Sequence, residues 1–442
     1  MMKNQNIFLL LITALIVYLS RGMTVAFAQD AKEHIRRNFN IKPGNRLTID
    51  SEIGTIDVRT ADKSEIEVVV TKEAKGKLDN KTQKAFADFE ITFKRNSSNV
   101  RVEGKFKRDP QYWMEKGHPL RVHFQVAVPY RFDVVLKTGS IGDIHVGDLD
   151  GNVKAESDVG NLNFGEIRGT VWGKTGGPGD ITLKACQSDV DVESGIGHIK
   201  LGSVTGRVTA KTGGPGDVTL EQCQSDVDIE SDVGHMRLGS VSGKVVAKTG
   251  GPGNITLGAC QSDVDVESDV GHIKLGAIAG KVDAKTGGPG DVTLEQCQSD
   301  VDVESDVGHI RLDSVSGKVN AKTGGPGNIT LGACQNSVEV ESDIGNIDAE
   351  IPTRPLHPWI LRTSGPGKIR VTLSPDAALN IDAETHGRIS SDIPFQAQGP
   401  LTGPKLKGTI NGGGPLLKLR TSIGEIRLKK KDLKRELGRK SL

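Results

Sequence analysis

One short text is repeated along this chain with little change, and the repeat restricts the possible folds more than any other feature. A motif that begins Lys-Thr-Gly recurs every 37 residues. It starts at Lys137, Lys174, Lys211, Lys248, Lys285 and Lys322, with a degenerate copy at Arg362. A fixed period of this length indicates a repeat array, in which each unit packs against its neighbours instead of enlarging one core.

Each 37-residue unit contains two similar halves. The segments VTAKTGGPGDVTLEQC (208–223) and VDIESDVGHMRLGSV (227–241) share a skeleton in which a glycine turn separates two short stretches. The alternation of apolar and polar residues in these stretches predicts strands, and the glycines supply the corners. We therefore expect an all-β, β-helix-like parallel β-solenoid, with turns of about 18–19 residues, two turns per repeat and about eleven or twelve turns along the array.

The two-turn unit has an electrostatic explanation. One predicted outward position carries lysine in one turn and glutamate in the next. We name this column the charge ladder, and its predicted members are Lys174, Glu193, Lys211, Glu230, Lys248, Glu267, Lys285, Glu304, Lys322 and Glu341. Opposite charges on neighbouring strands favour pairing, whereas a slip by one turn would stack like charges. We expect the charge ladder to fix the register of the turns.

The five cysteines occupy one equivalent position, which is Val or Ile in the intervening turns. They are Cys186, Cys223, Cys260, Cys297 and Cys334. A position shared by valine, isoleucine and cysteine predicts an inward-facing column, which we name the core column. Equivalent positions two turns apart are separated by about 9.6 Å, which exceeds the limit of about 7 Å between the Cα atoms of a disulfide. We therefore expect buried free thiols.

A third column alternates histidine with aspartate or asparagine and is named the His/Asp column. Its candidate metal ligands are His198, His235, His272, His309, Asp180, Asp217 and Asp291. Imidazole beside carboxylate is suited to transition-metal binding or to a pH-sensitive pair. A polar ladder beside a turn is the simpler interpretation. We expect no metal and no cofactor, because a single column supplies fewer ligands than a tetrahedral site needs.

The N-terminal sequence predicts export. Lys3 precedes an apolar run at 7–19, and Ala26-Phe27-Ala28 provides a cleavage site, so residues 1–28 are expected to be a signal peptide. No second apolar stretch predicts a transmembrane span in the mature chain, whose expected location is the periplasm, the cell surface or the extracellular space. The balance of 57 Lys and Arg residues against 56 Asp and Glu residues argues against a nucleic-acid partner.

The remaining sequence divides around the array. The expected parts are an N-terminal β-rich cap (29–136) with a non-repetitive insertion (about 72–130), the tandem-repeat solenoid (137–350), degenerate turns with a C-terminal cap (351–428) and a basic tail (429–442). Within the insertion we expect a short helix at 81–90 and a strand at 122–129. Atypical terminal units are expected because the ends of a repeat array need caps.

Several stretches outside the perfect repeats support a family resemblance. They are SEIGTIDV (51–58), VAVPYRFDVVLKTGSIGDIHV (126–146) and GGGPLLKLRTSIGEIRLKK (412–430). Together with the export signal and the short repeated strands, they resemble a bacterial family of exported β-strand-repeat proteins that is named after adhesins and whose domain has no known function. The resemblance covers about 47–430 and implies a β-helix-like protein of the cell envelope. It supplies no catalytic residues.

The sequence contains no G-x-S-x-G, H-E-x-x-H or P-loop motif. We therefore expect no enzyme and no catalytic residues. The favoured function is a non-catalytic cell-envelope solenoid that acts as an adhesin-like binding surface or a rigid scaffold, with envelope or extracellular polymers or surface proteins as partners. Two alternatives stay open. The first is a carbohydrate-active β-helix protein, similar to a polysaccharide lyase or hydrolase; it would need a cluster of carboxylates, which the periodic columns do not predict. The second is metal or pH sensing by the His/Asp column.

Overall fold

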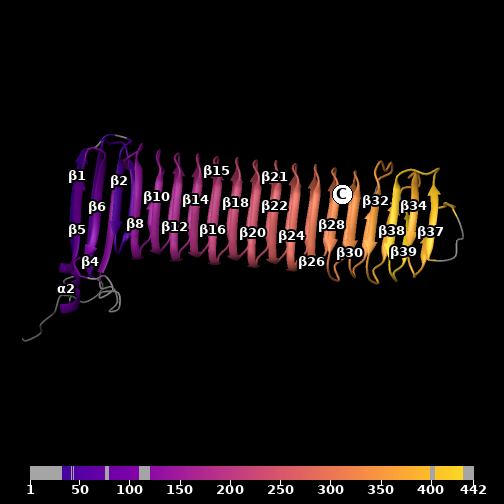
Figure 1. Ribbon diagram of the computed structural model, residues 1–442. Coiled ribbons are helices and arrows are strands. Elements are labelled where there is room, and N and C mark those ends of the chain that lie inside the picture. Colours follow the sequence, from indigo (N-terminus) through magenta and orange to yellow (C-terminus); the bar gives the residue numbers. More distant parts are fainter. Residues whose placement is uncertain are drawn as a thin grey trace, which may run out of the picture.

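The computed structural model describes residues 32–40, 42, 44–74, 79–108, 120–398 and 404–431. The expected signal peptide and all of the expected basic tail beyond Lys431 lie outside the described residues. The described chain forms an elongated rod of strands stacked side by side (Figure 1). This architecture confirms the predicted parallel β-solenoid.

Each turn contributes one strand to each of two facing sheets. Thirteen even-numbered strands, from β8 to β32, stack in parallel in sheet B, so the solenoid has about thirteen turns. The sheet B strands are β8 (Asp133–Ile141), β10 (Val153–Val159), β12 (Val171–Pro178), β14 (Val190–Ile196), β16 (Val208–Pro215), β18 (Val227–Val233), β20 (Val245–Pro252), β22 (Val264–Val270), β24 (Val282–Pro289), β26 (Val301–Val307), β28 (Val319–Thr323), β30 (Val338–Ser342) and β32 (Trp359–Thr363).

Odd-numbered strands from β9 to β33 stack in the same way in sheet A. They are β9 (Ile144–Val146), β11 (Leu162–Ile167), β13 (Ile181–Cys186), β15 (Ile199–Val204), β17 (Val218–Cys223), β19 (Met236–Val241), β21 (Ile255–Cys260), β23 (Ile273–Ile278), β25 (Val292–Cys297), β27 (Ile310–Val315), β29 (Ile329–Cys334), β31 (Ile347–Glu350) and β33 (Ile369–Leu373). The chain therefore alternates between the sheets at two corners in every turn.

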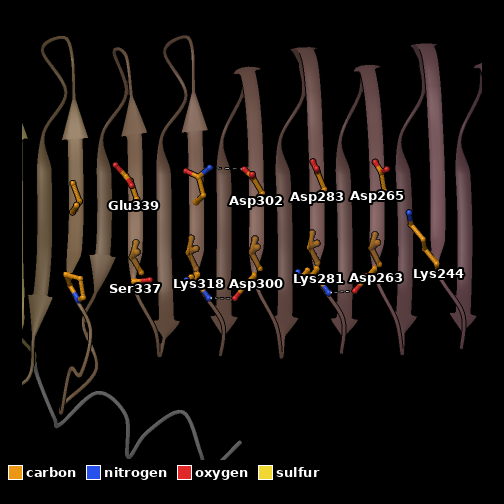
Figure 2. A pocket seen from close by; sticks show the side chains of 18 residues that line it. Lys244, Asp263, Asp265, Lys281, Asp283, Asp300, Asp302, Lys318, Ser337 and Glu339 are labelled. Carbon is orange, nitrogen blue, oxygen red and sulfur yellow. Dashed lines mark hydrogen bonds between the residues drawn. The ribbon is translucent and has the colours of Figure 1, made fainter.

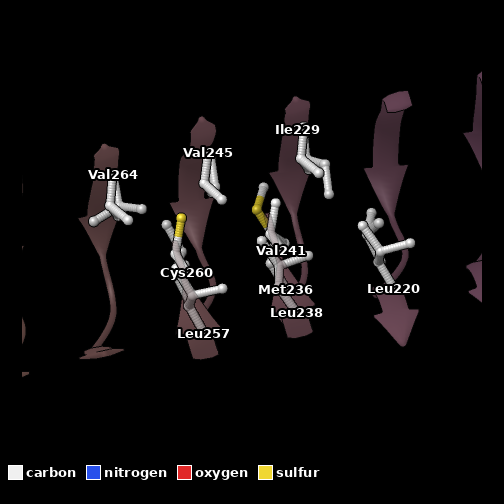
Figure 3. Packing of buried hydrophobic residues seen from close by; sticks show 14 of the residues in the cluster. Leu220, Ile229, Met236, Leu238, Val241, Val245, Leu257, Cys260 and Val264 are labelled. Carbon is white, nitrogen blue, oxygen red and sulfur yellow. The ribbon is translucent and has the colours of Figure 1, made fainter. Parts of the chain in front are cut away.

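The core lies between the two sheets and follows from the alternation of side chains along each strand. In β16, Val208, Ala210 and Thr212 are buried, whereas the residues between them point to solvent. The sheet A strands contribute larger side chains such as Leu220 and Leu238, which pack against valines and isoleucines of sheet B (Figure 3). Each turn alone could not bury its apolar face, so stacking of neighbours supplies the core.

At the N-terminal end, the strands do not stack in chain order. The elements are β1 (Lys32–Asn40), β2 (Arg46–Ser51), β3 (Thr55–Ala61), β4 (Glu65–Ala74), α2 (Asn80–Asp88), β5 (Phe89–Arg95), β6 (Asn99–Phe106) and β7 (Leu120–Pro129). Strand β2 lies between β8 and β6 in sheet B, and β3 lies between β9 and β7 in sheet A. Antiparallel strands then close the sheets: β4 and β1 in sheet A, and β5 in sheet B.

The C-terminal end repeats this arrangement. Its strands are β34 (Leu379–Glu384), β35 (Ile389–Ser391), β36 (Gln396–Ala397), β37 (Lys405–Ile410), β38 (Leu416–Thr421) and β39 (Ile426–Lys430). Strand β38 inserts between β32 and β34, and β39 inserts between β33 and β35. The outermost strands are antiparallel or very short. Such edges discourage end-to-end pairing of exposed parallel strands.

Candidate binding surfaces along the rod

The charge ladder lies on the outer face of sheet B. Its lysines and glutamates occupy paired positions on neighbouring strands, from Lys174 and Glu193 to Lys322 and Glu341. The distance from Nζ to the nearest carboxylate oxygen is 2.8 Å for Lys174–Glu193, 2.6 Å for Lys211–Glu230 and 3.2 Å for Lys248–Glu267. Lys285 and Lys322 depart from this pattern. The Nζ of Lys285 lies 3.4 Å from Asp283 of its own strand, and Lys322 forms no ion pair with any described side chain.

The His/Asp column forms a hydrogen-bonded ladder at the corner between sheet B and sheet A. The backbone N–H of Asp217 donates to Nδ1 of His198 at 3.0 Å, and the N–H of His235 donates to Oδ1 of Asp217 at 2.8 Å. Nδ1 of His235, His272 and His309 accepts a hydrogen bond from the next turn in the same way. Each side chain thus satisfies a backbone donor that the corner would otherwise leave unpaired.

The electrostatics of this corner follow from those contacts. Burial alone would raise the pKa of Asp217, but the hydrogen bond from the His235 N–H and the Arg237 guanidinium outweigh it and hold that pKa below its usual value. Within the described part of the chain, no group of three or more His, Cys, Asp and Glu side chains is arranged to hold a metal ion. The candidate ligands lie in one column, and their Nδ1 and Oδ1 atoms accept hydrogen bonds from backbone N–H groups of the next turn.

The core column places all five cysteines in the interior as free thiols. The thiol of Cys223 donates to the carbonyl oxygen of Gly206 at 3.3 Å, and Cys186, Cys260 and Cys297 make the equivalent contact. Burial raises the pKa of the Cys334 thiol to about 12. These thiols are therefore protonated near neutral pH and poorly suited to nucleophilic chemistry.

The structure adds a second corner ladder that the sequence interpretation missed. At the corner between sheet A and sheet B, the backbone N–H of Lys281 donates to Oδ1 of Asp263, and that of Lys318 donates to Oδ1 of Asp300, both at 2.8 Å. Arg207 and Lys244 donate to aspartates of the preceding turn in the same way. The signal was present, because an aspartate or a basic residue precedes the first valine of successive sheet B strands.

A groove runs along the outer face of sheet B. It has a volume of about 680 Å³ and extends from Lys244, just before β20, to Ile360 in β32. One edge carries Lys244, Asp263, Lys281, Asp300, Lys318 and Ser337, and the other carries Asp265, Asp283, Asp302 and Glu339 (Figure 2). Asn320 pairs with Asp302 on the second edge. We name this feature the sheet B groove. Six carboxylates and three ammonium groups line it, so its net charge is negative.

The expectation that no carboxylate cluster interrupts the periodic columns is wrong at the sheet B groove. Asp265, Asp283 and Asp302 occupy paired positions on three neighbouring strands. The cause is a single residue, because the positions equivalent to Asp283 in other units hold Trp172, Thr209, Val246 or Asn320. One substitution therefore converts an interrupted column into a stack of three like charges, which repel one another and favour a cationic group nearby.

These features define a class of protein: a long β-solenoid whose exposed side chains repeat at fixed intervals along a rod. The chain belongs to the Toastrack DUF4097 family, whose sequence profile matches residues 23–276. This match confirms the family resemblance expected from the sequence.

Three solved structures are similar to the chain at low identity. A "putative cell adhesion protein" from Clostridium sporogenes is 9% identical, with 90% of this chain and 100% of that chain covered and a TM-score of 0.14. A "putative adhesin" from Bacteroides fragilis is 11% identical, with coverages of 90% and 98% and a TM-score of 0.15. A "putative adhesin" from Parabacteroides distasonis is 10% identical, with coverages of 72% and 97% and a TM-score of 0.20. No curated protein matches the chain.

Proposed function

We propose that this protein is a non-catalytic, exported solenoid of the cell envelope that binds extended polymers or surface proteins in an adhesin-like manner. The observation that carries the proposal is the exposure of the same charged side chains in every second turn of a continuous rod. Sites repeated about 9.6 Å apart suit a partner that is itself extended and repetitive. Many weak contacts on one rigid body give avidity that no single contact provides.

The outer face of sheet A offers the clearest repeated site. Lys200, Arg237, Lys274 and Arg311 stand in one column and are all exposed. Threonines occupy the same column in the intervening turns. Cations at this spacing, separated by hydroxyl groups, match a linear polymer that carries carboxylate, sulfate or phosphate groups.

Co-sedimentation tests this proposal. The chain from residue 29 onward is mixed with envelope fractions and insoluble acidic polysaccharides, and the supernatant is assayed for released sugar ends. The informative variant replaces Lys200, Arg237, Lys274 and Arg311 with threonine, the residue already present between them. A control variant replaces four exposed basic residues of the N-terminal end, Lys63, Arg95, Lys107 and Arg108, so that the change in net charge is the same.

We expect retention of the unmodified chain and of the control, weaker retention of the sheet A variant, and no released sugar ends. Equal retention of both variants would contradict the sheet A site. Absence of retention on every fraction would contradict binding altogether, and the rod would then be a spacer.

A second candidate, a carbohydrate-active enzyme, is favoured by one observation, the carboxylate stack in the sheet B groove. Neighbouring strands are about 4.8 Å apart, which is near the separation of about 5–5.5 Å between the two carboxyl groups of retaining glycosidases. Release of sugar ends in the same assay, abolished by Asp283→Asn, would support this candidate. Release that persists in Asp283→Asn would place the activity elsewhere.

A further inference from the structure

We propose that the sheet B groove is a docking site for the chain's own basic segment at 432–442, which follows the last described residue. The proposal commits to this occupant because the point of exit, the charge and the length of the segment all match the groove. It does not depend on polymer binding, since it concerns contacts within one chain.

The described chain ends beside the groove. The backbone N–H of Lys431 donates to the carbonyl oxygen of Leu373 at 2.8 Å, and its Nζ lies 2.6 Å from a carboxylate oxygen of Glu350. Glu350 is the last residue of β31, and the loop that follows it leads directly to Pro358 and Ile360 at the end of the groove. Strand β39 stacks directly on β33, so the exit lies about one turn beyond the groove.

The charges of segment and groove are opposite. The segment carries four basic residues, Lys434, Arg435, Arg439 and Lys440, against two acidic ones. The groove carries twice as many carboxylates as ammonium groups. Asp265, at the end of the acidic edge farthest from the exit, forms no ion pair with any described side chain, although its charge helps to raise the pKa of Lys248. Its carboxylate oxygens therefore remain able to pair with a further cation.

The end of the groove nearest the exit also offers apolar surface. Leu356 is 76% exposed, and Pro358 beside it is exposed. These two side chains place apolar surface near the end of the charged groove. Leu433 and Leu437, in the first six residues of the segment, are suited to cover them.

The length of the segment suffices. The groove extends from Lys244, just before β20, to β32, which corresponds to about 29 Å at 4.8 Å per step. The eleven residues of 432–442 span about 36–40 Å when extended. The segment therefore reaches from the exit along most of the groove.

Zero-length carbodiimide cross-linking of the full chain tests the contact, because it joins amines to carboxylates only where they touch. We expect mass spectrometry to find Lys434 or Lys440 joined to Asp265, Asp283, Asp302 or Glu339. Mixing ¹⁵N-labelled with unlabelled chains shows whether the two cross-linked residues belong to the same chain or to two different chains. Cross-links within one isotope class support docking in the same chain, and mixed-isotope cross-links overturn it in favour of a second copy.

Trypsin cleavage after Arg435 and Arg439 provides an independent readout. The variant Asp265→Asn with Asp302→Asn should accelerate this cleavage by about fivefold, because two exposed ion pairs are lost. Asp191→Asn with Asp228→Asn is the matched control, since these residues hold the equivalent column positions outside the groove. Equal cleavage rates in both variants and the unmodified chain, or the absence of cross-links to the groove, would overturn the proposal.

Discussion

A methyl group added at Gly253 should break the corner at which it lies. A Cβ atom on Gly253 would sit 2.0 Å from the carbonyl oxygen of Gly234 in the preceding turn. The same contact recurs at Gly216 and Gly290, where the corresponding distances are 2.0 Å and 2.1 Å. The stacked corners thus leave no room for a side chain, which explains why the last glycine of the Gly-Gly-Pro-Gly stretch is retained in every unit. The clash could be relieved only by moving the backbone by about 1 Å.

The expected cost follows from this geometry. Overpacking of a well-packed region costs about 1–3 kcal/mol, and the backbone of Gly253 is not in the left-handed region, so no conformational strain is added. Gly250, three residues earlier in the same corner, provides a matched control. A Cβ atom there meets nothing within 4 Å, so Gly250→Ala should change stability by less than about 0.5 kcal/mol or raise it slightly.

Amide hydrogen exchange is the appropriate assay, because a solenoid opens locally and a single global free energy describes it poorly. In Gly253→Ala, the amides of β18, β20 and β22 should exchange about 5- to 150-fold faster, which corresponds to 1–3 kcal/mol. Gly250→Ala should exchange like the unmodified chain. The steric reasoning is refuted if Gly253→Ala retains normal protection, or if both variants lose protection equally.

Three further predictions concern the ladders and the core. Glu230→Lys should lower the denaturation midpoint because it places three lysines on neighbouring strands, and Lys211→Glu in the same chain should restore part of that midpoint. If the effects of the two changes simply add, the Lys211–Glu230 pair contributes no interaction energy to stability. Thr212→Val, which removes a buried hydroxyl–hydroxyl hydrogen bond, should cost about 1 kcal/mol, whereas Thr219→Val on the outer face should be nearly neutral in the same urea titration. Burial raises the pKa of the Cys334 thiol from 9.0 to about 12, so folding favours the protonated thiol and the free energy of unfolding should fall as the pH rises from 9 toward 12. Cys334→Val should reduce this fall, and the same pH profile in the variant would contradict a raised pKa at Cys334.

The fold was predictable because one period is visible in the sequence and one physical rule converts it into structure. Alternation along strands such as Val208–Pro215 decides which residues face inward, and the 37-residue repeat aligns those residues from turn to turn. The stacking of Lys211 on Glu230 follows directly. The arrangement of strands at the two ends was harder to predict from the sequence. Strands β2 and β38 pair out of chain order, and no periodic pattern in the sequence indicates such pairing.

The candidate surfaces were harder to predict for a different reason. The carboxylate stack in the sheet B groove depends on Asp283, one residue that differs from its equivalents, and periodic reasoning averages over such differences. The His/Asp column was visible as a stack, but the direction of each imidazole was not. The contact from the Asp217 N–H to Nδ1 of His198 requires knowledge of the corner geometry, which the spacing alone does not supply.

Removal of one repeat tests most directly whether the periodic face is the binding surface. Deleting residues 174–210 joins Gly173 to Lys211, removes two turns with Lys200, and keeps the sheet B groove and the alternation of charges. We predict a folded, shorter rod that is retained less strongly on acidic envelope polymers, and stronger retention when the same unit is duplicated. Retention that is unchanged in both the shortened and the lengthened chain would contradict a multivalent, adhesin-like role for the array.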